Sequence, residues 1–210
     1  MSLSEPKATR EPLHRRTIEI VGYKREDGLF DIEAHLLDRK DLEFPVGGRR
    51  LAPGVAVHDM WLRITVDREL RIVDAEASTD SMPYAGECDR IVPDYAKLIG
   101  LSIGPGYLRH VKERLGGVRG CTHVTELAGS LATAAFQTFA GQGLMATDRK
   151  PPQLDRCHAL DTHGTTVARF YPKWHRGADG LSDAGSSETP EAGGAGMTDP
   201  RQGLGHKPGC

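Results

Sequence analysis

The sequence predicts an α+β fold, in which an antiparallel sheet is followed by helices that pack on one of its faces. Apolar and polar residues alternate through much of the first half of the chain, which is typical of strands with one face in water. From Tyr95 onward the bulky apolar residues recur at helical spacing instead. Because the strands and the helices form two successive blocks, an antiparallel sheet covered by helices is favoured over a parallel sheet.

The first strands are predicted on either side of a tight turn. Residues 17–22 and 30–36 both alternate, and residues 24–28 between them end in Asp27-Gly28. This dipeptide is typical of a hairpin turn because glycine tolerates a positive φ.

A second hairpin is predicted farther along the chain. Residues 60–66 and 71–77 alternate, and the four residues 67–70 join them as a turn. The segment 44–54 before this hairpin is expected to be a loop, since it contains Pro45, Gly47, Gly48 and Pro53.

Three helices and a final hairpin are predicted in the second half. Residues 95–99 suggest a short helix, and Pro105 can open a second helix that ends before Gly116. A longer helix is expected from the apolar face along 124–138. Residues 157–171 read as a closing hairpin with a turn at 161–164.

The 210 residues suggest one folded domain with extensions at both ends. We expect a flexible N-terminus over 1–12, a single α+β domain over 13–174 and a disordered tail over 175–210. The tail is rich in glycine, serine and proline and has too few bulky apolar residues to offset the entropy of ordering.

The charge and hydropathy of the chain argue against nucleic acid and membrane as partners. The formal net charge of -2 gives no electrostatic reason to expect nucleic acid. The segment 127–145 is low in charge, but its polar residues and helical spacing indicate a helix buried on one face rather than a membrane span. The polar first dozen residues lack the apolar core of a signal peptide, so a cytoplasmic location is expected.

The segment Gly116–Leu127 is the strongest candidate for chemistry. A turn rich in glycine places Cys121 and His123 at the start of the long helix. The unpaired backbone N–H groups and the helix dipole at that position favour a thiolate. Thiolate and imidazole are also good zinc ligands. Alternatively, Cys121 is a small buried packing residue and His123 donates to a carbonyl in the first helical turn.

Three further places offer ligand-type side chains. Cys88 lies in a turn after the predicted sheet, and His58-Asp59 begins a strand, either as a metal ligand with a supporting carboxylate or as an ordinary polar strand start. Cys157-His158 combines both ligand types, but a buried packing role for Cys157 is favoured. The basic cluster His14-Arg15-Arg16 is interpreted as a solvated strand end.

Several motifs resemble an uncharacterised bacterial family catalogued as domain of unknown function 2889. They cover nearly the whole folded region but imply no activity. The motifs are Leu13-His14-Arg15-Arg16, Gly22–Asp31, His58-Asp59-Met60-Trp61, Gly120-Cys121-Thr122-His123 and Cys157-His158-Ala159-Leu160.

From Val57 to about Phe139 the chain is also distantly similar to the NifU-type iron–sulfur cluster assembly scaffolds. Val57-His58-Asp59 stands where those proteins have Cys-Gly-Asp, Cys88 follows the hairpin, and Cys121 meets the final helix. The first sulfur ligand of the scaffolds is absent here, and His58 would supply nitrogen in its place. His123 would replace the histidine that lies just before the third cysteine in the scaffolds. This resemblance implies a scaffold-like architecture and a metal site that suits zinc better than an iron–sulfur cluster.

The leading hypothesis is therefore a protein that binds zinc or an iron–sulfur species and acts as a metal or sulfur carrier. It requires the turn after the sheet, the helix start and the His-Asp strand to meet in one pocket. One alternative is an enzyme with Cys121 as nucleophile and His58 or His123 as base. Another is a non-catalytic module that binds a protein partner. The expected metal ligands are His58, Asp59, Cys88, Cys121 and His123.

Overall fold

The computed structural model describes residues 3–140, 150–151 and 153–177. The chain divides into two compact units, Met1–Ala146 and Thr147–Cys210, and each is considered by itself. Residues 178–210 of the expected disordered tail lie outside the described residues. The proposed single domain over 13–174 and the flexible residues 1–12 stay predictions.

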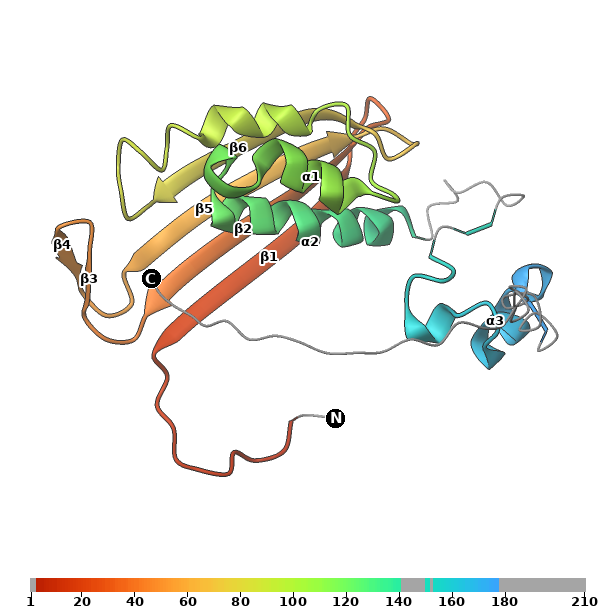
Figure 1. The fold of residues 1–210 in the computed structure, drawn as a ribbon, viewed down its shortest axis with the longest axis horizontal. Coiled ribbons are helices and arrows are strands. Elements are labelled where there is room, and N and C mark those ends of the chain that lie inside the picture. The colour runs from red at the N-terminus through yellow and green to blue at the C-terminus, as the bar shows by residue number, and fades with distance from the viewer. Residues whose placement is uncertain (1–2, 141–149, 152, 178–210) are drawn as a thin grey trace, which may run out of the picture. The chain divides into compact units, whose positions relative to one another are not determined.

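The first unit is built on a four-stranded antiparallel sheet with the order β1-β2-β5-β6, which confirms the α+β prediction (Figure 1). All four strands extend beyond the residues whose alternation predicted them. They are β1 (His14–Lys24), β2 (Phe30–Lys40), β5 (Ala56–Val66) and β6 (Ile72–Ser81).

The expected loop over 44–54 is wrong in part. It contains a small separate hairpin of β3 (Phe44–Val46) and β4 (Arg49–Leu51). Gly47 sits at its turn with φ +58°, and a Cβ there would lie 2.1 Å from the Pro83 carbonyl oxygen. Only glycine fits this turn, so the hairpin packs closely against the segment after β6.

Helices cover one face of the sheet, as predicted (Figure 1). The first is the 3-10 helix η1 (Val92–Leu98), followed by α1 (Tyr107–Leu115), the 3-10 turn η2 (Gly117–Arg119) and the long α2 (Thr122–Phe139). The core consists of the inward residues of the strands and the apolar faces of these helices. Its fully buried side chains include Phe30, Ile32, Leu36, Met60, Leu62, Ile64, Tyr95, Leu115, Leu127 and Leu131.

Helix α2 packs closely against β1 at Gly22. A Cβ on Gly22 would lie 1.9 Å from Thr138 Oγ1, so this strand position has room only for glycine. No described helix is long and apolar enough to cross a membrane.

The second unit contains η3 (His158–Leu160), α3 (Thr165–Phe170) and η4 (Pro172–Trp174). The predicted closing hairpin over 157–171 is therefore wrong. Asp161 accepts a hydrogen bond from the His163 N–H at 2.9 Å and forms a turn that leads into α3 instead of a strand. Cys157 precedes η3 and is exposed, so the prediction of a buried Cys157 is also wrong.

Candidate functional site

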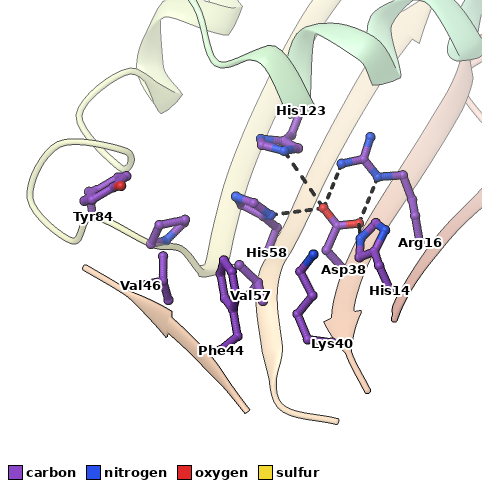
Figure 2. A pocket seen from close by; sticks show the side chains of 11 residues that line it. His14, Arg16, Asp38, Lys40, Phe44, Val46, Val57, His58, Tyr84 and His123 are labelled. Atoms are coloured by element: carbon purple, nitrogen blue, oxygen red, sulfur yellow. Dashed lines mark hydrogen bonds and ion pairs between the residues drawn. The ribbon is translucent and has the colours of Figure 1, made fainter. Parts of the chain in front are cut away.

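The candidate site is a row of side chains that crosses three strands near one end of the sheet. Arg16 of β1 lies directly opposite Asp38 of β2, and Asp38 lies directly opposite His58 of β5. Residues at the same level on neighbouring strands point to the same face, so these three side chains meet. His123, in the first turn of α2, reaches the row from the helical layer (Figure 2).

This face of the sheet changes character along the strands. On β2 the inward positions run Phe30, Ile32, Ala34 and Leu36, all fully buried, and then Asp38. The alternation that builds the hydrophobic core therefore carries a carboxylate to the inner face as well. Asp38 is only 3% exposed, so its charge needs partners within the protein.

Asp38 has a full set of donors. Arg16 donates from Nε to Oδ1 and from Nη2 to Oδ2, both at 2.8 Å, in the two-pronged geometry that suits a carboxylate. His14 Nε2 donates to Oδ1 and His58 Nδ1 donates to Oδ2, each at 3.0 Å. Burial alone would raise the pKa of Asp38, but the Arg16 guanidinium and the two imidazoles outweigh it and lower the pKa to about 2.

His58 and His123 form a close pair of imidazoles beside this carboxylate. Their ring centroids lie 3.8 Å apart, and His123 Nε2 lies 3.9 Å from Asp38 Oδ2. Burial lowers the pKa of His58, and the neighbouring His123 lowers it further. This direction favours the neutral imidazole, which is the form that binds metal ions.

Among the described residues, one group has three ligand-type side chains that converge. One ligand atom from each of Asp38, His58 and His123 lies within 4.8 Å of the others. Two imidazoles and a carboxylate are a common ligand set for divalent transition metals.

Cys121 borders the group but is not one of its three members. It precedes the first residue of α2, and its Sγ lies 3.8 Å from His123 Nδ1. Burial raises the pKa of the Cys121 thiol, but the hydrogen bond with His123 and the backbone N–H groups of Val124 and His123 outweigh it, so the pKa is lowered.

Tyr95 holds the start of α2 in place. Its buried hydroxyl donates to the Cys121 carbonyl oxygen at 2.9 Å and accepts from the Cys121 N–H at 3.0 Å. Burial raises the pKa of Tyr95 to about 12, so the hydroxyl remains protonated and able to do both. This fixes the positions of Cys121 and His123 over the sheet.

A cavity of about 280 Å³ opens beside the site. In Figure 2 the ionic side chains lie at one end, the two imidazoles lie in the middle, and apolar residues line the other end. The apolar wall comes from the β3–β4 hairpin, β5 and the turn after β6, and consists of Phe44, Val46, Val57, Pro83 and Tyr84.

The structure brings together only some of the expected metal ligands. His58 and His123 lie side by side, and Cys121 is within reach of His123. Asp59 points to the opposite face of the sheet, because neighbouring strand residues alternate, and accepts from His35 Nε2 at 2.6 Å. Cys88 remains in its turn, where its N–H donates to the Tyr84 carbonyl, and is not part of the converging group.

Sequence reasoning missed His14, Arg16 and Asp38. The basic cluster at 14–16 was expected to be solvated, but His14 and Arg16 instead hold Asp38. A signal was present: Asp38 continues the inward-facing series of β2, where an apolar residue would be expected. A carboxylate in such a series indicates either a functional site or the end of a strand. Which of the two applies depends on the residues that lie opposite it on the neighbouring strands.

A family model described as "Protein of unknown function (DUF2889)" matches residues 14–137. The match covers more than half of the 210 residues, so the chain belongs to this family. It spans the whole candidate site, from His14 to His123. No curated protein and no solved structure matches the chain.

Proposed function

We propose that this protein binds one zinc or similar divalent transition ion through Asp38, His58 and His123. The observation that carries the proposal is the convergence of their three ligand atoms within 4.8 Å. The imidazoles approach Asp38 Oδ2 through ring nitrogens, at 3.0 Å from His58 and 3.9 Å from His123. An ion held by the three side chains would take the place of those contacts.

The surroundings suit such an ion. Arg16 donates to both carboxylate oxygens of Asp38 and fixes their orientation, and the thiol of Cys121 faces the second nitrogen of His123. Metal-binding imidazoles usually have a hydrogen-bond partner on their other nitrogen, and the Cys121 sulfur takes that position at His123. Three protein ligands leave one coordination position open, which suits an exchangeable or reactive ion better than a closed structural site.

An iron–sulfur cluster is a less suitable occupant. Clusters are held mainly by thiolates, and Cys121 is the only cysteine that borders the described site. A carrier role is therefore proposed for the metal ion and not for a cluster. The cytoplasmic location stays a prediction.

The chain supplies its own control for a zinc-binding test. His35 and Asp59 form a second histidine–aspartate pair on the opposite face of the same two strands. We expect equilibrium dialysis of chelator-stripped full-length protein to give one zinc per chain, retained by His35→Ala and lost in His58→Ala and His123→Ala. Zinc at a hundredfold excess over its Kd should raise the free energy of unfolding by about 2.7 kcal/mol. Equal zinc binding by all four proteins would contradict the proposal.

A second candidate function is favoured by one specific contact. Cys121 Sγ lies beside His123 Nδ1, and His123 Nε2 faces Asp38, which is the order of a nucleophile, its base and an orienting carboxylate. This arrangement predicts that iodoacetamide alkylates Cys121 in metal-free protein faster at neutral pH than it alkylates the exposed Cys157. His123→Ala should abolish that advantage. Protection of Cys121 by zinc would favour the metal function instead.

A further inference from the structure

The cavity beside the site is lined by one cation, Lys40, that no described carboxylate neutralises. Arg16 and Lys40 contribute two positive charges to its lining, and Asp38 contributes one negative charge. Arg16 is paired with Asp38, whereas Lys40 forms no ion pair among the described residues. Arg16 also donates from Nη1 to Glu126 at 2.6 Å, so Lys40 is the cation of the lining that is left to pair with a ligand.

Lys40 is placed for contact with a ligand in the cavity. It follows Asp38 by two residues on β2 and therefore shares its inward face, and it lies directly opposite His14. Its Nζ lies 5.1 Å from the ring centroid of Phe44, at the boundary between the ionic end and the apolar wall. Figure 2 shows the side chain between Phe44 and the Asp38 group.

The apolar wall determines the rest of the ligand. Phe44 and Val46 project from the β3–β4 hairpin, and Val57 is 5% exposed at the base of β5. An apolar group that packs against this wall is removed from water, which stabilises the complex by roughly 25 cal/mol per Å² of apolar surface buried. The volume of about 280 Å³ is at the lower limit of ligand pockets, so the occupant is small.

We propose that this cavity binds a small monocarboxylate with an apolar body. The carboxylate contacts Lys40 and the imidazole edge, and the body lies against the hairpin wall. A monoanion neutralises the charge of Lys40, whereas a dianion such as a phosphate monoester would leave a negative charge close to Asp38. The inference goes beyond the metal site and does not require an ion.

Hexanoate is a suitable probe, and hexanamide is its neutral counterpart. Calorimetric titration of the full-length protein in the presence of a chelator should show saturable binding of hexanoate, with hexanamide at least roughly tenfold weaker. The same titration after zinc loading separates the two proposals. Hexanoate binding that persists without metal supports the cavity assignment even if zinc does not bind.

Lys40→Met removes the charge and keeps the length of the side chain, and Lys40→Arg restores the charge. Hexanoate should bind roughly tenfold more weakly to Lys40→Met and normally to Lys40→Arg. The control is Lys24→Met, at the other end of the same pair of strands. Thermal unfolding checks that each variant is folded. Equal binding of hexanoate and hexanamide, unchanged binding by folded Lys40→Met, tighter binding of inorganic phosphate, or no binding of hexanoate would overturn the proposal.

Discussion

Replacing Asp38 by asparagine tests the central ionic group of this protein most directly. Asp38→Asn keeps the shape of the side chain but removes the charge that two contacts from Arg16 and one from each of His14 and His58 neutralise. The folded state lowers the pKa of Asp38 from an ordinary value near 3.8 to about 2. At 1.36 kcal/mol per pKa unit, the charged form contributes roughly 2 kcal/mol to stability at neutral pH.

The sign of the pH dependence follows from this lowered pKa. Stability from Asp38 is present above its unfolded pKa, near 3.8, and is lost as the pH falls toward the folded value of about 2. Urea denaturation followed by circular dichroism should show Asp38→Asn less stable than wild type by roughly 2 kcal/mol at neutral pH. The difference should shrink as the pH approaches 2, because the wild-type carboxylate then becomes protonated.

Asp27→Asn is the matched control, since Asp27 is paired with Arg25 at the surface. Because an exposed ion pair contributes little, its urea midpoint should fall much less than that of Asp38→Asn at neutral pH. Equal stability of Asp38→Asn and wild type at neutral pH, or a difference that does not change on acidification, would refute the ionic role assigned to Asp38.

Three further substitutions test how the site is supported. Tyr95→Phe removes the hydroxyl that pairs with the backbone of Cys121 and should cost about 1–3 kcal/mol in urea denaturation. Gly22→Ala forces a Cβ against Thr138 and should cost about 1–3 kcal/mol, whereas Gly104→Ala, with open space around it, should be tolerated. Gly47→Ala strains the β3–β4 turn against the Pro83 carbonyl, so it should weaken hexanoate binding and lower the melting temperature only slightly. Unchanged affinity for hexanoate would argue against the hairpin as the cavity wall.

Much of the first unit could be predicted from sequence because its patterns are local. The alternation along 30–36 and 60–66 identified β2 and β5, and the apolar face over 124–138 identified α2. The closing hairpin over 157–171 failed because short apolar runs fit strand and helix equally, and the turn at Asp161 decided for a helix.

The candidate site was only partly predictable because it depends on the pairing of distant strands. His58 and His123 were found from residue type and position, but Asp38 joins them only through the β1–β2 and β2–β5 registers. The expected link between Cys88 and Cys121 relied on sequence order, and the fold does not bring Cys88 into the group. Register could not be obtained from one sequence without knowing which strands are neighbours.

The shared register of β1, β2 and β5 means that the hydrophobic core and the candidate site form together or not at all. Shifting β2 by a single position would rotate Asp38 to the outside and, in the same step, turn Ile32 and Leu36 away from the helices. A length change in the 25–29 turn is therefore expected to remove solubility and ligand binding together. Variants that fold at all should retain the geometry of the ionic row.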